Sequence, residues 1–149
     1  ESLAKQLNCY SQELKQHAEA YRIELVKNVA TKQSSAEDTS VLLLDAAGLF
    51  KALLDDIQAG LPTGFIAQCF HDAFVRVLVE MAELVRAVYG ISIVALGGGV
   101  FMNRYLTEQA LIQLQERGFT VAMNKDLPPN DASISYGQAV LGWQAQNKE

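Results

Sequence analysis

Apolar residues recur every three or four positions in five stretches of the chain, which predicts five helices. The stretch at 65–88 carries the widest apolar stripe, so we expect a core helix there. Glycines at positions 60, 90 and 118 suit the C-terminal ends of three of these helices. The predicted helices cover residues 2–29, 49–57, 65–88, 103–116 and 132–145.

Two short apolar runs, Ile91–Leu96 and Phe119–Met123, predict strands, and the first should be buried and parallel. Val41–Leu44 is either a third short strand or the lead-in to the following helix. The strand–helix–strand order in the second half predicts an α/β fold with a short parallel sheet and a right-handed crossover. Ligands bind such sheets at the carboxyl ends of the strands. The glycine run Gly97–Gly99 and the loop Pro128–Asp131 both follow strands, so both should lie at that edge.

The beginning of the chain differs from the rest. A narrow apolar stripe runs from Leu3 to Leu25, and the polar segment TKQSSAEDTS at 31–40 is typical of a linker. We therefore divide the chain into residues 1–39, an amphipathic helix with a linker, and residues 40–149. The stripe either packs on the core of this chain or forms a coiled-coil contact with a second copy or another domain. The small number of heptads favours core packing.

Composition and charge narrow the class of protein. The net charge is -5, and an acidic surface disfavours nucleic acid. Charged residues interrupt the longest apolar region, so no membrane span is predicted. Cys9 and Cys69 match neither metal-ligand spacing nor a disulfide framework, so we expect buried free thiols and a cytoplasmic protein. The chain begins at Glu1 rather than Met, and we expect a segment of a longer polypeptide.

The glycines Gly97, Gly98 and Gly99 leave the backbone bare between a predicted strand and a predicted helix. Their spacing fits neither the dinucleotide fingerprint nor a Walker A loop. A turn that binds a phosphate and a turn that only packs tightly are equally compatible with the pattern. Asn103 either caps the next helix or contacts a ribose or phosphate, and Arg104 either neutralises phosphate or is solvated.

Asp131 places a carboxylate at the start of the last predicted helix, where it either caps the helix or binds a metal. A metal site needs further ligands, and His17 and His71 form no H-x-x-x-H pair. We therefore do not expect a complete metal site within this chain. Asp55 and Asp56 lie on the polar side of a helix and should be solvated. The sequence contains no G-x-S-x-G elbow and no order typical of a serine–histidine–aspartate triad.

Three segments resemble the carboxyl-terminal end of the HypF-type carbamoyltransferases, which are hydrogenase maturation proteins. The first two are ALGGGVFMNRYL at 95–106 and GFTVAMNKDLPPNDASISYGQAV at 118–140. With the upstream segment LDAAGLFKALLDDIQAGLPTGFIAQCFHDAFVRVLVEMAEL, the resemblance covers about residues 40–143. It implies the C-terminal lobe of an actin-like (ASKHA) ATPase fold, in which nucleotide is held between two lobes.

The resemblance also implies a reaction and its site residues. ATP and carbamoyl phosphate form carbamoyl-adenylate, and the carbamoyl group passes to the C-terminal cysteine of a HypE-like partner, for the cyanide ligand of NiFe hydrogenase. Gly97, Gly98, Gly99 and Asn103 match residues at the nucleotide. Asp131 matches a ligand of a divalent metal, which would be zinc, iron or magnesium. No residue is assigned a catalytic role.

The chain also departs from the family pattern. Two metal-binding histidines, the first nucleotide lobe, an acylphosphatase-like domain and Cys-rich zinc modules have no counterpart here, and Ala132 replaces a usual glycine. We therefore expect the missing N-terminal lobe as a partner and no activity from this chain alone. Two other functions stay open. One is transfer to tRNA or to a small-molecule hydroxyl, which the GGGVFMN and PPND forms disfavour. The other is a non-enzymatic interaction module that uses the Leu3–Leu25 stripe.

Overall fold

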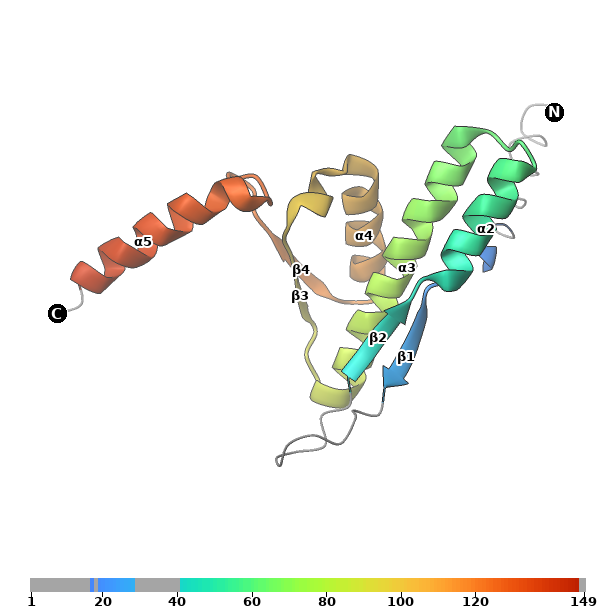
Figure 1. Ribbon diagram of the computed structural model, residues 1–149. Helices are drawn as coiled ribbons and strands as arrows, with labels where there is room; N and C mark the ends of the chain where they lie inside the picture. The colour runs from blue at the N-terminus through green and yellow to red at the C-terminus, as the bar shows by residue number, and fades with distance from the viewer. Residues whose placement is uncertain (1–16, 18, 29–40, 148–149) are drawn as a thin grey trace, which may run out of the picture. The chain divides into compact units, whose positions relative to one another are not determined.

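The computed structural model describes residue 17, residues 19–28 and residues 41–147. The chain forms two compact units, residues 1–78 and residues 79–149, whose elements are labelled in Figure 1. The predicted boundary at residue 39 and the linker at 31–40 lie outside the described residues. Most of the Leu3–Leu25 stripe lies outside them as well.

The first unit contains an antiparallel pair of strands, β1 (Glu24–Asn28) and β2 (Val41–Asp45), which pair along their whole length. The helix predicted over residues 2–29 is therefore wrong at 24–28. Pairing with VLLLD gives the backbone groups of both segments their partners, and this non-local bonding overrides the local helical spacing. The two possibilities for Val41–Leu44 are also resolved, because this segment is a strand.

Two helices complete the first unit. In α2 (Ala47–Gln58), the first N–H donates to the Asp45 carboxylate, with 2.9 Å between the two atoms. The next helix is α3 (Thr63–Tyr89), of which the residues up to Leu78 belong to this unit. Figure 1 shows α2 running beside α3. Both helices confirm the predictions made from apolar spacing.

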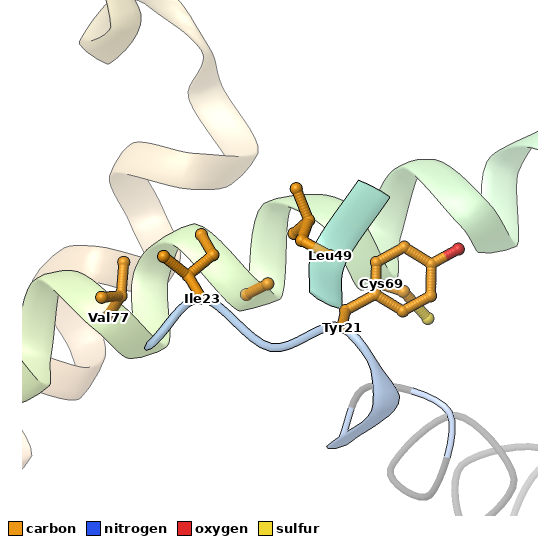
Figure 2. Close-up of a cluster of buried hydrophobic side chains, with 6 residues drawn as sticks. Tyr21, Ile23, Leu49, Cys69 and Val77 are labelled. Carbon is orange, nitrogen blue, oxygen red and sulfur yellow. The ribbon is translucent and has the colours of Figure 1, made fainter. Parts of the chain in front are cut away.

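The core of the first unit gathers side chains from α2, α3 and the segment ahead of β1 (Figure 2). Tyr21 is only 1% exposed, and its hydroxyl donates to Oδ2 of Asp56 at 2.9 Å. Burial, together with this hydrogen bond, raises the pKa of Tyr21. The prediction that Asp56 is solvated is wrong, because the buried hydroxyl needs an acceptor. The buried members of this core are Tyr21, Ile23, Leu49, Cys69, Ala73 and Val77.

Cys69 is a buried free thiol, which confirms the prediction for this residue. Burial raises its pKa to about 11, so the thiol stays protonated near neutral pH and packs as a small apolar group. Cys9 lies outside the described residues.

The second unit contains the predicted strand–helix–strand sequence. The strands β3 (Ile93–Leu96) and β4 (Thr120–Met123) pair in parallel, and α4 (Arg104–Glu116) connects them. The apolar spacing in α4 predicts an inward face of Leu106, Ala110, Leu111 and Leu114. Three of these residues, Leu106, Ala110 and Leu114, are buried, and Leu111 is half-buried. The fold is therefore the predicted one, a helix-rich α/β structure with a short parallel sheet.

The strand β3 is less buried than its sequence predicts. Ile93 is 66% exposed, and Leu96 is the one buried residue of the strand. A parallel strand is buried on both faces only where other strands flank it and helices cover both sides of the sheet. Among the described residues this sheet has two strands, so the prediction of a buried strand is wrong here.

Arg86 holds the end of α3 against the start of β4. Its guanidinium carbon lies 4.1 Å from the centroid of the Phe119 ring, and its Nη1 donates to the carbonyl of Arg117 at 2.8 Å. Glu83, one turn earlier on α3, pairs with Arg117, with 3.3 Å between Oε1 and Nε. These contacts fix the strand that leads into the loop Pro128–Asp131.

The chain ends in a single turn, η2 (Asp131–Ser133), and the helix α5 (Ile134–Gln146). The helix itself confirms the prediction for 132–145. The sequence also predicts that the apolar residues Ile134, Ala139, Val140 and Trp143 lie inward, and this prediction is wrong. No residue of α5 is buried, and Trp143 is 67% exposed. The described residues contain no surface that covers these side chains.

Within the part of the chain that the structure describes, no helix is both long enough and apolar enough to cross a membrane.

Candidate functional site

The glycine turn after β3 has a backbone that only glycine adopts readily. Gly98 has φ 108° and ψ 159°, a conformation that costs an L-residue roughly 1–3 kcal/mol. A methyl group added at Gly97 or Gly98 would meet no atom within 4 Å, so the space beside the turn is open. The turn leads into a single 3₁₀ turn, η1 (Gly99–Met102), rather than directly into α4. Bare backbone beside open space is the geometry that a close-approaching ligand requires.

The glycine turn and the loop after β4 are bonded to each other. The N–H of Gly98 donates to the carbonyl oxygen of Pro129 at 2.6 Å. A Cβ placed on Gly99 would lie 4.0 Å from the Cβ of Asn130. The structure therefore confirms that the two loops meet at one edge of the parallel sheet. It also shows that the Gly98 N–H has an internal partner, so a ligand would meet the turn through other atoms.

Asn103 caps α4, which is one of the two roles predicted for it. Its side-chain Oδ1 accepts from the N–H of Leu106 at 3.1 Å. Thr107 strengthens the same turn, since its hydroxyl lies 2.9 Å from the carbonyls of both Phe101 and Asn103. Contact of Asn103 with a ribose or phosphate stays a prediction.

Arg104 follows the cap and is exposed. Its Nε lies 2.7 Å from Oε1 of Glu108, one turn along α4, and its side chain is 88% exposed. The hydrogen bond to this carboxylate raises the pKa of Arg104. The solvated alternative for Arg104 is therefore the one seen, with a local acidic partner.

Asn130, which is not among the site residues predicted from the sequence, caps the turn that precedes α5. Its Oδ1 accepts from the Ala132 N–H at 3.1 Å, and its carbonyl accepts from the Ser133 N–H at 3.2 Å. Asp131 therefore lies in the first turn of η2 and does not act as the cap. The sequence does contain the signal for this cap, because Asn is as good a cap as Asp and comes one residue earlier. Asp131 is exposed, which leaves its carboxylate accessible.

The described residues do not form a metal centre by themselves. No group of three or more His, Cys, Asp or Glu side chains with metal-binding geometry occurs among them. His71 binds the Ala67 carbonyl through Nδ1 at 2.6 Å, and His17 lies 3.6 Å from Asp56. A bound zinc ion takes three or four protein ligands, so Asp131 alone does not hold one. Its role as a metal ligand stays a prediction that depends on residues outside this chain.

The fold and this pair of loops define the class of protein. The sequence model of the family described as "Carbamoyltransferase, Kae1-like Domain, second subdomain" matches residues 4–138. The chain belongs to this family, and its fold is that of a lobe of the actin-like type.

The relatives that it resembles are HypF proteins. It is 35% identical over 105 residues to the carbamoyltransferase HypF of Synechocystis sp., a match that covers 70% of this chain and 13% of that protein. It is 34% identical over 92 residues to HypF2 of Cupriavidus necator, which covers 62% of this chain and 11% of that protein.

A solved structure agrees with these matches. Full-length HypF in a phosphate- and nucleotide-bound form has a TM-score of 0.70 and 31% identity over 93% of this chain and 18% of that one. The chain therefore spans less than a fifth of the length of these HypF proteins.

Proposed function

We propose that this chain forms one wall of the nucleotide site of a HypF-type carbamoyltransferase. The complete enzyme would take up one water and convert ATP and carbamoyl phosphate into carbamoyl-adenylate, with release of phosphate and pyrophosphate. The carbamoyl group would then pass to the sulfur of the C-terminal cysteine of a HypE-like partner, with release of AMP. This chain supplies the wall made by the glycine turn and by the loop Pro128–Asp131. The facing wall would come from another lobe.

The observation that carries this proposal is the hydrogen bond from Gly98 to Pro129. It joins two loops at the carboxyl edge of a parallel sheet, which is where ligands bind in folds of this kind. Open space lies beside the bare backbone of Gly97 and Gly98. The family match and the HypF relatives make adenine nucleotide the ligand to test at this edge.

Each of the candidate residues has a definite part in the proposal. Gly97, Gly98 and Gly99 let the nucleotide approach the backbone closely, as no Cβ intervenes. Asn103 sets the start of α4 and so the position of the turn before it. Asp131 would contribute one oxygen ligand to a divalent metal, with the other ligands supplied by the rest of the enzyme.

Titration calorimetry with a non-hydrolysable ATP analogue tests the site. We expect weak or no binding by this chain alone, because one wall cannot enclose the nucleotide. We expect binding by the complete protein that contains both lobes. Tight binding by the chain alone would contradict the one-wall argument. No binding by the complete protein would refute the nucleotide site.

The acceptor is tested with labelled carbamoyl phosphate and ATP. We expect the label on a HypE-like protein and none on a HypE variant that lacks its C-terminal cysteine. Transfer of the label to tRNA, with none to HypE, would overturn this part of the proposal.

Gly98→Ala is the sharpest variant for the site. Because Ala at φ 108° is strained by roughly 1–3 kcal/mol, we expect the turn to shift and the complete protein to lose about tenfold or more in nucleotide affinity. Gly118→Ala is the matched control. Gly118 also has a positive φ, of 77°, and open space around it, but it lies between α4 and β4 at the opposite end of the strands. Equal losses of affinity in the two variants would mean that the effect comes from general destabilisation.

A further inference from the structure

The helix α5 has an unusual composition for an exposed element. Its sequence ISYGQAVLGWQAQ contains no charged residue. Surface helices normally carry an apolar stripe on one side and charged residues on the other, whereas a helix that is apolar on all sides is normally buried. Every residue of α5 is nevertheless exposed in this chain.

The apolar residues of α5 form two separate faces. Ile134, Leu141 and Ala145 recur at steps of seven and four, and so share one face of the helix. Tyr136, Val140 and Trp143 recur at steps of four and three and share the other. Of the larger side chains, Ile134 is 56% exposed, Leu141 67%, Tyr136 58% and Trp143 67%. A partner that covers α5 must therefore contact it on two sides.

The place of α5 in the chain indicates which partner that is. The helix starts directly after η2, and η2 contains Asp131 and follows the loop bonded to the glycine turn. Whatever encloses α5 is thereby brought next to the candidate nucleotide site. The depletion of charge and the presence of Tyr and Trp are typical of the buried core of a protein interface.

We infer that α5 inserts into the other subdomain of the Kae1-like domain, with both of its apolar faces buried there. The inference rests on the proposed function for the identity of this partner. It is supported by the match to a second subdomain and by the chain covering 18% of a full-length HypF. In this arrangement α5 anchors the facing wall of the site beside the loops that it completes.

The sole tryptophan of the chain, Trp143, is a direct probe. Its fluorescence and its quenching by acrylamide are measured in the 149-residue chain and in the complete polypeptide that contains both subdomains. In the complete polypeptide, the contribution of Trp143 is obtained as the difference from Trp143→Phe. We expect a blue-shifted emission and a several-fold smaller quenching constant in the complete polypeptide.

Two variants report on the two faces, and a third is the matched control. Leu141→Glu and Val140→Glu each place a charge on one apolar face, and we expect each to restore the quenching of Trp143 in the complete polypeptide. Ser135→Glu adds the same charge between the faces, and we expect it to leave Trp143 shielded. None of the three is expected to change the fold of the chain alone, since all three positions are exposed.

Equal quenching of Trp143 in the chain and in the complete polypeptide would overturn the inference. Shielding that appears in the chain alone and grows with its concentration would also overturn it, because the occupant would then be a second copy. Titration of the same samples with the ATP analogue separates the two proposals. Shielding without nucleotide binding would refute the proposed function and leave the docking intact, and binding with an exposed Trp143 would do the reverse.

Discussion

The helices α4 and α5 have the same length but differ in burial and in charge. Each has 13 residues, each follows a strand of the parallel sheet, and each comes after an asparagine that caps a turn or helix at its start. In α4, three residues are buried and charged residues lie on the other faces. In α5, no residue is buried and none is charged. Two stretches of sequence with the same helical spacing therefore do not tell where the surface that covers each helix lies. The distribution of charged residues around each helix gives that information.

The largest difference in stability between the two helices is expected when one leucine is removed from each. Leu114 of α4 is 0% exposed, so Leu114→Ala should destabilise the chain by about 2–5 kcal/mol. Leu141 of α5 is 67% exposed, so Leu141→Ala should change the stability by less than about 0.5 kcal/mol. Urea unfolding followed by circular dichroism measures both. Comparable losses would show that α5 packs within this chain.

Removal of the asparagine caps should have an intermediate effect on stability. Asn103→Ala removes the acceptor for the Leu106 N–H and should cost about 1 kcal/mol. Asn103→Asp keeps an acceptor and should recover most of that loss. Asn130→Ala should cost less, because the capped turn η2 leads into a helix with no buried residues. A larger cost at Asn130 than at Asn103 in urea unfolding would contradict the contrast between the two helices.

The smallest effect is expected at Arg104. Its ion pair with Glu108 is short, but the arginine is exposed to solvent, which screens the attraction. Arg104→Gln should therefore leave the unfolding midpoint of the chain unchanged within error, at low and at high salt. A salt-dependent loss of stability would show that the pair contributes to α4 after all.

Local patterns were sufficient for most of the elements. Apolar spacing predicts α2, α3 and α4, and the glycines at 60, 90 and 118 all have the positive φ that suits a helix end. The order of strands and helix after Gly90 predicts the parallel pairing of β3 with β4. It also predicts the meeting of the two loops, because parallel strands end at the same edge of a sheet.

The failures arise where the deciding partner is distant. Leu25 fits a helical stripe, yet it belongs to β1 because it pairs with β2, a segment further along the chain. Asp56 looks solvated by its place on α2, and only the fold brings Tyr21 to it. The missed cap at Asn130 is a different kind of failure, since capping by its side chain is a local effect. The prediction names the neighbouring Asp131 as the cap instead. The nucleotide and metal roles rest on the family resemblance, because nothing in the described geometry selects adenine or a particular ion.

The bond between Gly98 and Pro129 has a consequence for how such proteins diverge. Both of its atoms belong to the main chain, and the acceptor is a carbonyl that every amino acid has. Replacement of Pro129 can therefore preserve the bond, whereas replacement of Gly98 disturbs the backbone that offers the N–H. Across distant relatives, we expect the backbone geometry of these two loops to be kept even where the amino-acid sequence of the loop after β4 has changed. Comparison of backbones should then recognise it in sequences where a search for PPND finds nothing.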